Sequence, residues 1–183
     1  MYLFIVLYAY KVDDRRIQGK YHWALLACPM ADLDVRALSS AKVYQITNKE
    51  SIRHWRTDHK SVDVLKSERV IGFIRLPEVQ GGSAVTGFIE ESPAVHEEDS
   101  YPPDARQWSC AWWVIRLIRS FVDAEMMVDP VRGRDTEGNW FERFKQRVQA
   151  QGMKLEQKRG QWMTSQDTGS MTIQSIILDF NAT

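Results

Sequence analysis

The chain has 183 residues, a length that favours a single domain over residues 1–183 with enough material to bury a core. Its composition, 44% hydrophobic and 26% charged, is typical of a folded protein and argues against disorder. Lysine plus arginine (24) balance aspartate plus glutamate (24), so no overall field attracts nucleic acid. Two cysteines are too few for a disulfide framework and favour a reducing, cytoplasmic location. The charge balance is compatible with a homodimer.

The N-terminal half has the pattern of consecutive strands. Residues 1–9 are apolar but too short to cross a bilayer, which needs about 20 helical residues, and we expect a strand buried on both faces. A short helix is predicted from Thr47 to about Arg56, where Thr47 and Glu50 match a capping box. Alternating and apolar runs predict further strands at residues 20–28, 42–46, 62–65 and 70–76.

The C-terminal half contains two predicted helices. Residues 80–103 hold paired glycines, prolines and an acidic run, and we expect a long flexible surface loop there. The strongest helical pattern covers residues 105–125, a second amphipathic helix covers 140–151 and ends at Gly152, and a last strand covers 171–180.

These elements predict an α+β domain. It would have a small, mainly antiparallel sheet packed against one long buried helix and a second amphipathic helix. Strands cluster early in the chain without β-α alternation, and Gly81-Gly82 lacks the spacing of a phosphate-binding loop. The pattern therefore argues against Rossmann and P-loop folds.

A cysteine and a histidine are the main candidates for chemistry. Cys110 lies near the start of the long predicted helix, where the helix dipole favours the nucleophilic thiolate. His22 lies on the second predicted strand and can take up or hold the thiol proton. A third polar group normally orients the imidazole, and Gln45 has that place if the third strand pairs with the second. Cys110, His22 and Gln45 are thus the predicted catalytic residues.

The activation of Cys110 depends on where its helix begins. Asp104, with Gln107 three residues later, matches a capping box. A helix capped there would put Cys110 in the second turn, where the dipole effect has largely faded. A helix capped by Ser109 would put Cys110 in the first turn and give a strongly activated thiol.

His22-Trp23 on an early strand, followed by Cys110-Ala111-Trp112-Trp113 at a helix start, resembles the permuted papain-like fold. That group includes the lecithin–retinol acyltransferase-like proteins and the NlpC-type cell-wall peptidases. The same residues are also similar to a family of fungal proteins, and the resemblance covers roughly residues 20–121. It implies a thiol hydrolase or acyl-transferring enzyme in which Cys110 attacks a carbonyl and His22 is general base, then acid. Where the acyltransferases carry a second histidine, this chain has Gln45.

Tryptophan is abundant around these residues. Trp23, Trp108 and Trp112 are predicted to line an apolar pocket for a small-molecule substrate, although their spacing also fits a plain core. Two other functions stay open on this evidence. One is a non-catalytic ligand-binding or interaction domain with the same fold. The other is a small cyclase or isomerase that uses His22 as an acid–base group without a covalent intermediate.

No metal, cofactor or membrane span is predicted. His54 and His59 are five residues apart and His96 precedes an acidic run, and neither spacing matches a zinc or calcium site. Basic residues are interspersed with acids, so nucleic acid is not an expected partner.

Overall fold

The structure is a computed structural model that describes residues 1–12, 15–30, 33–34, 38–49, 54–98, 101–131, 137–164 and 176–181. It confirms the α+β class. A six-stranded sheet has the order β6-β3-β2-β1-β7-β8, and its pairs are antiparallel except for β7 and β8. The strands of this sheet are β1 (Tyr2–Val12), β2 (Arg15–Cys28), β3 (Ala41–Tyr44), β6 (Lys60–Val62), β7 (Val70–Arg75) and β8 (Ile177–Asp179).

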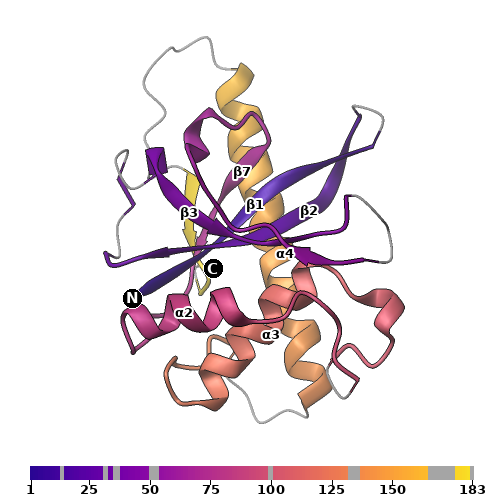
Figure 1. Cartoon of the computed structure of the whole chain (residues 1–183). Coiled ribbons are helices and arrows are strands. Elements are labelled where there is room, and N and C mark those ends of the chain that lie inside the picture. The colour runs from indigo at the N-terminus through magenta and orange to yellow at the C-terminus, as the bar shows by residue number, and fades with distance from the viewer. Residues whose placement is uncertain are drawn as a thin grey trace.

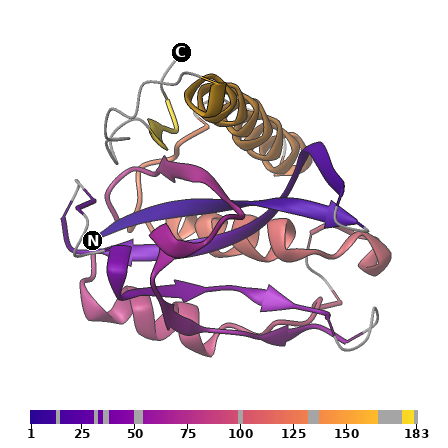
Figure 2. The same ribbon diagram turned by 90° about the horizontal axis from the view of Figure 1, so that it is seen from above.

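Helices and a small second sheet complete the described fold. Two short strands, β4 (Ile46–Thr47) and β5 (Arg56–Thr57), pair with each other. The α-helices are α2 (Ser83–Glu91), α3 (Cys110–Asp123) and α4 (Glu137–Thr164), and two 3-10 turns are η1 (Val64–Lys66) and η2 (Ala105–Gln107). Figure 1 shows α4 passing behind β1 and β2, with α2 and α3 below them, and Figure 2 shows the same arrangement from above.

The central hairpin of β1 and β2 is buried on both faces, as its apolar sequence predicts. Leu3, Ile5 and Leu7 lie in the larger core, which also contains the apolar sides of all three α-helices. Phe4 and Val6 face a second core on the other side of the sheet. Both faces of β1 are covered by other parts of the protein, so the side chains on both faces must be apolar. This explains the continuous apolar run in its sequence.

Residues 80–103 are not one long loop. Residues 83–91 form the helix α2, in which Val85 and Ile89 are buried and Phe88 packs edge-on against Phe121 of α3. Burial of apolar side chains four residues apart stabilises a helix here despite the glycine pair that precedes it.

Two predictions for the region between β3 and β7 are wrong. Thr47 belongs to β4 and Arg56 to β5, so neither is part of a helix, and residues 50–53 lie outside the described residues. The predicted strand at 62–65 ends at Val62, because Asp63 accepts the Leu65 N–H at 3.1 Å and starts the turn η1. Of the predicted last strand, 177–179 is confirmed as β8, and 171–175 lie outside the described residues.

The second amphipathic helix does not end at Gly152 but continues to Thr164. A Cβ atom at Gly152 would lie 2.4 Å from Cε2 of Tyr21 and 3.0 Å from Cδ1 of Leu7. The missing side chain therefore lets α4 approach the β1–β2 hairpin closely. Glycine serves here for close packing and not as a helix stop.

We expect Gly152→Ala to lower the free energy of unfolding by about 1–2 kcal/mol. Overpacking costs about 1–3 kcal/mol, more than the gain of up to about 1 kcal/mol in helix propensity. The matched control is Gly87→Ala in α2, where a Cβ would meet nothing within 4 Å and the propensity gain alone should appear. Urea denaturation measures both, and a Gly152→Ala protein as stable as the Gly87→Ala protein would contradict the packing argument.

Candidate functional site

The helix α3 begins at Cys110 because Ser109 caps it. The Ser109 hydroxyl accepts the Trp112 N–H at 3.4 Å, and its carbonyl accepts the Trp113 N–H at 3.0 Å. Asp104 instead caps the separate turn η2, where its carboxylate accepts the Arg106 N–H at 2.9 Å. Of the two possible helix starts, the structure has the one that puts Cys110 in the first helical turn. There the positive end of the helix dipole favours the thiolate.

A gap at the edge of β2 brings His22 to this helix start. β2 pairs with β3 at Leu25–Tyr44 and Leu26–Val43, and the pairing stops before Trp23. The Trp23 N–H therefore donates to Sγ of Cys110, at 3.5 Å, instead of to a strand carbonyl. The sulfur accepts the N–H that a neighbouring strand would otherwise bind. This hydrogen bond holds the start of α3 beside His22.

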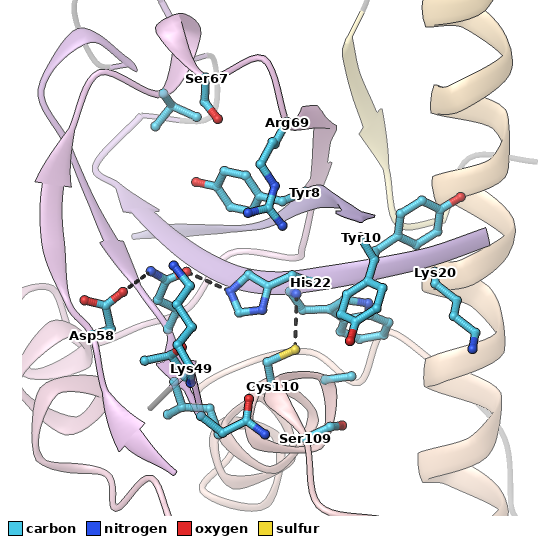
Figure 3. Close-up of a pocket in the computed structure, with 18 of the residues that line it drawn as sticks. Tyr8, Tyr10, Lys20, His22, Lys49, Asp58, Ser67, Arg69, Ser109 and Cys110 are labelled. Carbon is cyan, nitrogen blue, oxygen red and sulfur yellow. Dashed lines mark hydrogen bonds between the residues drawn. The ribbon is translucent and has the colours of Figure 1, made fainter. Parts of the chain in front are cut away.

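The side chains of His22 and Cys110 lie next to each other and interact electrostatically. On its other side, Nε2 of His22 lies 2.8 Å from Oε1 of Gln45. The Gln45 amide donates to Oδ2 of Asp58 at 2.7 Å, and Nζ of Lys60 donates to the same oxygen at 3.0 Å. Figure 3 shows Asp58, His22 and Cys110, with Cys110 beside the imidazole and dashed lines for the hydrogen bonds that Gln45 makes to Asp58 and His22.

The chain of contacts fixes the tautomer of His22. An ionised carboxylate only accepts hydrogen bonds, so the NH2 group of Gln45 faces Asp58 and its oxygen faces His22. That oxygen accepts the Nε2–H of the imidazole, at 2.8 Å. Nδ1 is then the ring nitrogen left to share a proton with Cys110.

Burial disfavours charge on both His22 and Cys110, but their contact outweighs it. Burial lowers the pKa of His22, while the charge of Cys110 and hydrogen bonds to Cys110 and Gln45 raise it above its usual value. Burial raises the pKa of Cys110, while the His22 charge, its hydrogen bond and the N–H groups of Trp23 and Ala111 bring it below its usual value. Both shifts favour moving the proton from sulfur to imidazole.

The Asp58 carboxylate stays ionised. Burial raises its pKa, but hydrogen bonds from Lys60 and Gln45 and the charges of Lys60 and Lys49 bring the pKa below its usual value. An ionised Asp58 keeps Gln45 in the orientation that His22 needs.

These residues line a cleft of about 870 Å³. Cys110 keeps 9% of its accessible surface and forms part of the cleft wall, whereas Cys28 keeps 3% and belongs to the second core. Trp23 also lines the cleft, as the sequence predicts.

The other two tryptophans do not line this cleft. The Trp108 indole N–H donates to the Ala94 carbonyl at 2.8 Å, and its ring is 4.9 Å from the Arg116 guanidinium. Trp112 packs edge-on against Tyr101. Both side chains belong to the larger core, so neither has the predicted place in the lining of this cleft.

Sequence reasoning missed Asp58 and His59. His59 accepts the backbone N–H of Gln45 at 3.3 Å, its ring packs against Tyr44 and Trp113, and burial lowers its pKa. Both residues lie between β5 and β6, which return to the end of β3. No local signal marks them, because only this return brings them to Gln45.

In the parts of the chain that the structure describes, no three His, Cys, Asp or Glu side chains gather as metal ligands. Among the described helices, none is both long and apolar enough to cross a membrane.

A family model matches residues 1–140, which include His22, Gln45, Asp58 and Cys110. The chain belongs to DUF6914, a family of unknown function. No curated protein and no solved structure matches the chain.

Proposed function

We propose that this DUF6914 protein is a thiol-dependent hydrolase or acyl-transferring enzyme acting on a small-molecule substrate in the cleft. The observation that carries the proposal is the placement of Cys110 beside the His22 imidazole at the start of α3, with Gln45 on the far side of the ring. A nucleophile, a base and a group that orients the base are the minimum set for this chemistry. The resemblance to permuted papain-like enzymes supports the same reaction.

In the proposed reaction, Sγ of Cys110 forms a bond to the carbonyl carbon of the substrate. The proton on Nδ1 of His22 passes to the leaving group as its bond to that carbon breaks, which leaves a thioester on Cys110. Neutral His22 then takes a proton from water or an acceptor hydroxyl or amine, which attacks the thioester. The acyl product leaves and the proton held by His22 returns the pair to its first state.

The start of α3 supports stabilisation of the tetrahedral intermediate. The first N–H groups of a helix have no partner within the helix, and those of Cys110 and Ala111 are the first two of α3. Donors at such a place offset the negative charge that develops on the carbonyl oxygen.

Alkylation of Cys110 by iodoacetamide tests the proposal without knowledge of the substrate. An ordinary thiol with a pKa of about 8.5 is only about 1% ionised at pH 6.5. We expect Cys110 to react at least about tenfold faster than free cysteine at that pH, because its pKa is lowered. Mass spectrometry of the Cys110 peptide measures the rate, and the buried Cys28 is the internal control that should stay unlabelled. Labelling no faster than free cysteine, at any pH from 5 to 8, would reject the proposal.

A further inference from the structure

The lining of the cleft carries an excess of positive charge, although the whole chain is neutral. It contains six basic side chains and two acidic ones. Both acidic groups already pair with lysines of the cleft, Asp58 with Lys60 at 3.0 Å and Asp63 with Lys66 at 3.4 Å. The basic side chains beyond these two pairs are Lys20, Lys49, Arg69 and Lys145, and the last of them pairs with Glu142 at 3.9 Å.

The fold holds Arg69 in place through the backbone of β1. Nε and Nη2 of its guanidinium donate to the Ala9 carbonyl of β1, at 3.3 and 3.1 Å. A guanidinium has five N–H donors, and those of Nη1 and one of Nη2 have no partner among the described residues and can bind a ligand. Figure 3 shows Arg69 on the same wall of the cleft as Tyr8 and His22.

The charge of Arg69 acts against the Cys110–His22 pair. It lowers the pKa of His22, and therefore disfavours the imidazolium that the reaction uses. No described carboxylate pairs with Arg69. Burial raises the pKa of the neighbouring Tyr8 to about 12, so that tyrosine stays neutral and does not offset the charge. An anion bound from solution would offset it.

We propose that the cleft takes an acyl substrate that carries an anionic group, a carboxylate or a phosphate, which Arg69 binds. The planar guanidinium matches either group with two parallel hydrogen bonds. Lys20 and Lys49, both exposed, add to the field that draws such a substrate in. This inference rests on the proposed function for the attack by Cys110, but the binding of the anion does not.

Two alkylating reagents of nearly equal size distinguish the effect of the reagent's charge from the intrinsic reactivity of Cys110. Iodoacetate is an anion and iodoacetamide is neutral, and each forms a thioether with Cys110 and releases iodide. Each rate is divided by the rate of the same reagent with free cysteine, and the iodoacetate value is then divided by the iodoacetamide value. We expect this ratio to exceed one in the natural protein. Arg69→Gln keeps a donor for the Ala9 carbonyl but removes the charge, and should lower the ratio about tenfold. The rate with iodoacetamide reports the reactivity of the Cys110–His22 pair itself, so the ratio removes any change that loss of the Arg69 charge causes in the pKa of His22.

Two variants control for loss of charge and loss of structure. Arg69→Lys keeps the charge and should keep most of the preference for iodoacetate. Lys154→Gln removes one charge from an exposed position of α4 that does not line the cleft, and should leave the ratio unchanged. The preference should also fall with added NaCl, since the screening length is about 10 Å at 0.1 M. An Arg69→Gln protein with the natural ratio would overturn the proposal.

A binding experiment separates this proposal from the proposed function. Titration calorimetry of Cys110→Ala with glutarate and with inorganic phosphate requires no reactive thiol, and the two probes distinguish a carboxylate site from a phosphate site. We expect at least one of them to bind, and binding to fall about tenfold or more when Arg69→Gln is added. Binding together with an unreactive Cys110 would keep the anion site and reject the thiol enzyme. If neither anion binds, the anion site is rejected whatever the reactivity of Cys110.

Discussion

Cys110→Ala should reduce the turnover of a small ester or thioester by at least about 10³-fold, because the variant has no atom that can form the acyl intermediate. His22→Asn should lose about 10²- to 10⁴-fold, the usual contribution of a general acid–base group. The losses should not add, because the thiolate and the imidazolium act as one unit. A panel of chromogenic esters and thioesters, with and without a carboxylate, is the measurement.

Cys28→Ala is the matched control for removal of a thiol. Cys28 lies in the second core, on the side of the sheet away from α3, so its loss should affect stability and not turnover. Circular dichroism should show all three variants folded.

Cys110→Ala and His22→Asn together also distinguish the proposed thiol enzyme from the other possible functions. An isomerase or cyclase that uses only acid–base chemistry would lose activity with His22→Asn and keep it with Cys110→Ala. A binding domain would show no turnover in the natural protein.

Turnover should have a bell-shaped dependence on pH. Activity requires the thiolate, which is lost as the pH falls through the lowered pKa of Cys110. It also requires the imidazolium, which is lost as the pH rises through the raised pKa of His22. Because Cys110 and His22 interact, the pKa values that set the acid and alkaline limits of the profile describe the coupled pair and not either residue alone. A profile that rises steadily up to the pKa of an ordinary thiol would mean that the pair does not form.

The sequence predicts the central strands and marks Cys110 and His22 as catalytic candidates because their signals are local. The apolar run of β1 and the alternation before Cys28 give the central hairpin directly. The start of α3 could not be decided, because Asp104 and Ser109 are both good N-caps and each does cap a turn or a helix. In the structure Asp104 caps only the turn η2, Ser109 caps the long helix, and the Trp23 N–H contacts the sulfur at the first residue of that helix.

Predictions failed where distant segments decide the outcome. Gly152 looks like a helix stop locally, but Tyr21 and Leu7 of the hairpin need the space that it leaves. Trp112 lies close to Cys110 in the sequence, which suggests that it lines the pocket. On α3 its side chain points to a different side from Cys110 and packs against Tyr101. Asp58 contacts Gln45 only because β5 pairs with β4 and so brings Asp58 back beside Gln45. No local sequence pattern shows this pairing.

Gln45→Leu should lower kcat by about 10²-fold, within the range by which acid–base groups contribute, and should leave KM nearly unchanged. Leucine has a similar size but cannot accept the Nε2–H of His22, which Oε1 accepts at 2.8 Å in the natural protein. The imidazole then loses both its fixed orientation and the preference for a proton on Nε2. Because the hydrogen bond that Gln45 accepts from His22 helps to raise the pKa of His22, the upper limit of the pH profile should move to lower pH.

Asp58→Ala tests whether the carboxylate acts through Gln45. Without Asp58 the amide can turn, and in half of its orientations it would present NH2 instead of oxygen to His22. We expect a loss of kcat of about tenfold, since a turned amide still returns to the productive orientation part of the time. Asp63→Ala is the matched control, because Asp63 is also a cleft carboxylate paired with a lysine but caps η1 instead of contacting Gln45.

The double variant decides between positioning and simple electrostatics. If Asp58 acts only by orienting Gln45, its removal from the Gln45→Leu protein should have no further effect on kcat, so that the two losses do not add. If Asp58 acts on His22 through its charge, the losses should multiply and the upper limit of the pH profile should move again. Multiplying losses would leave Gln45 as the partner of His22 and remove Asp58 from the chain of contacts that fixes the imidazole.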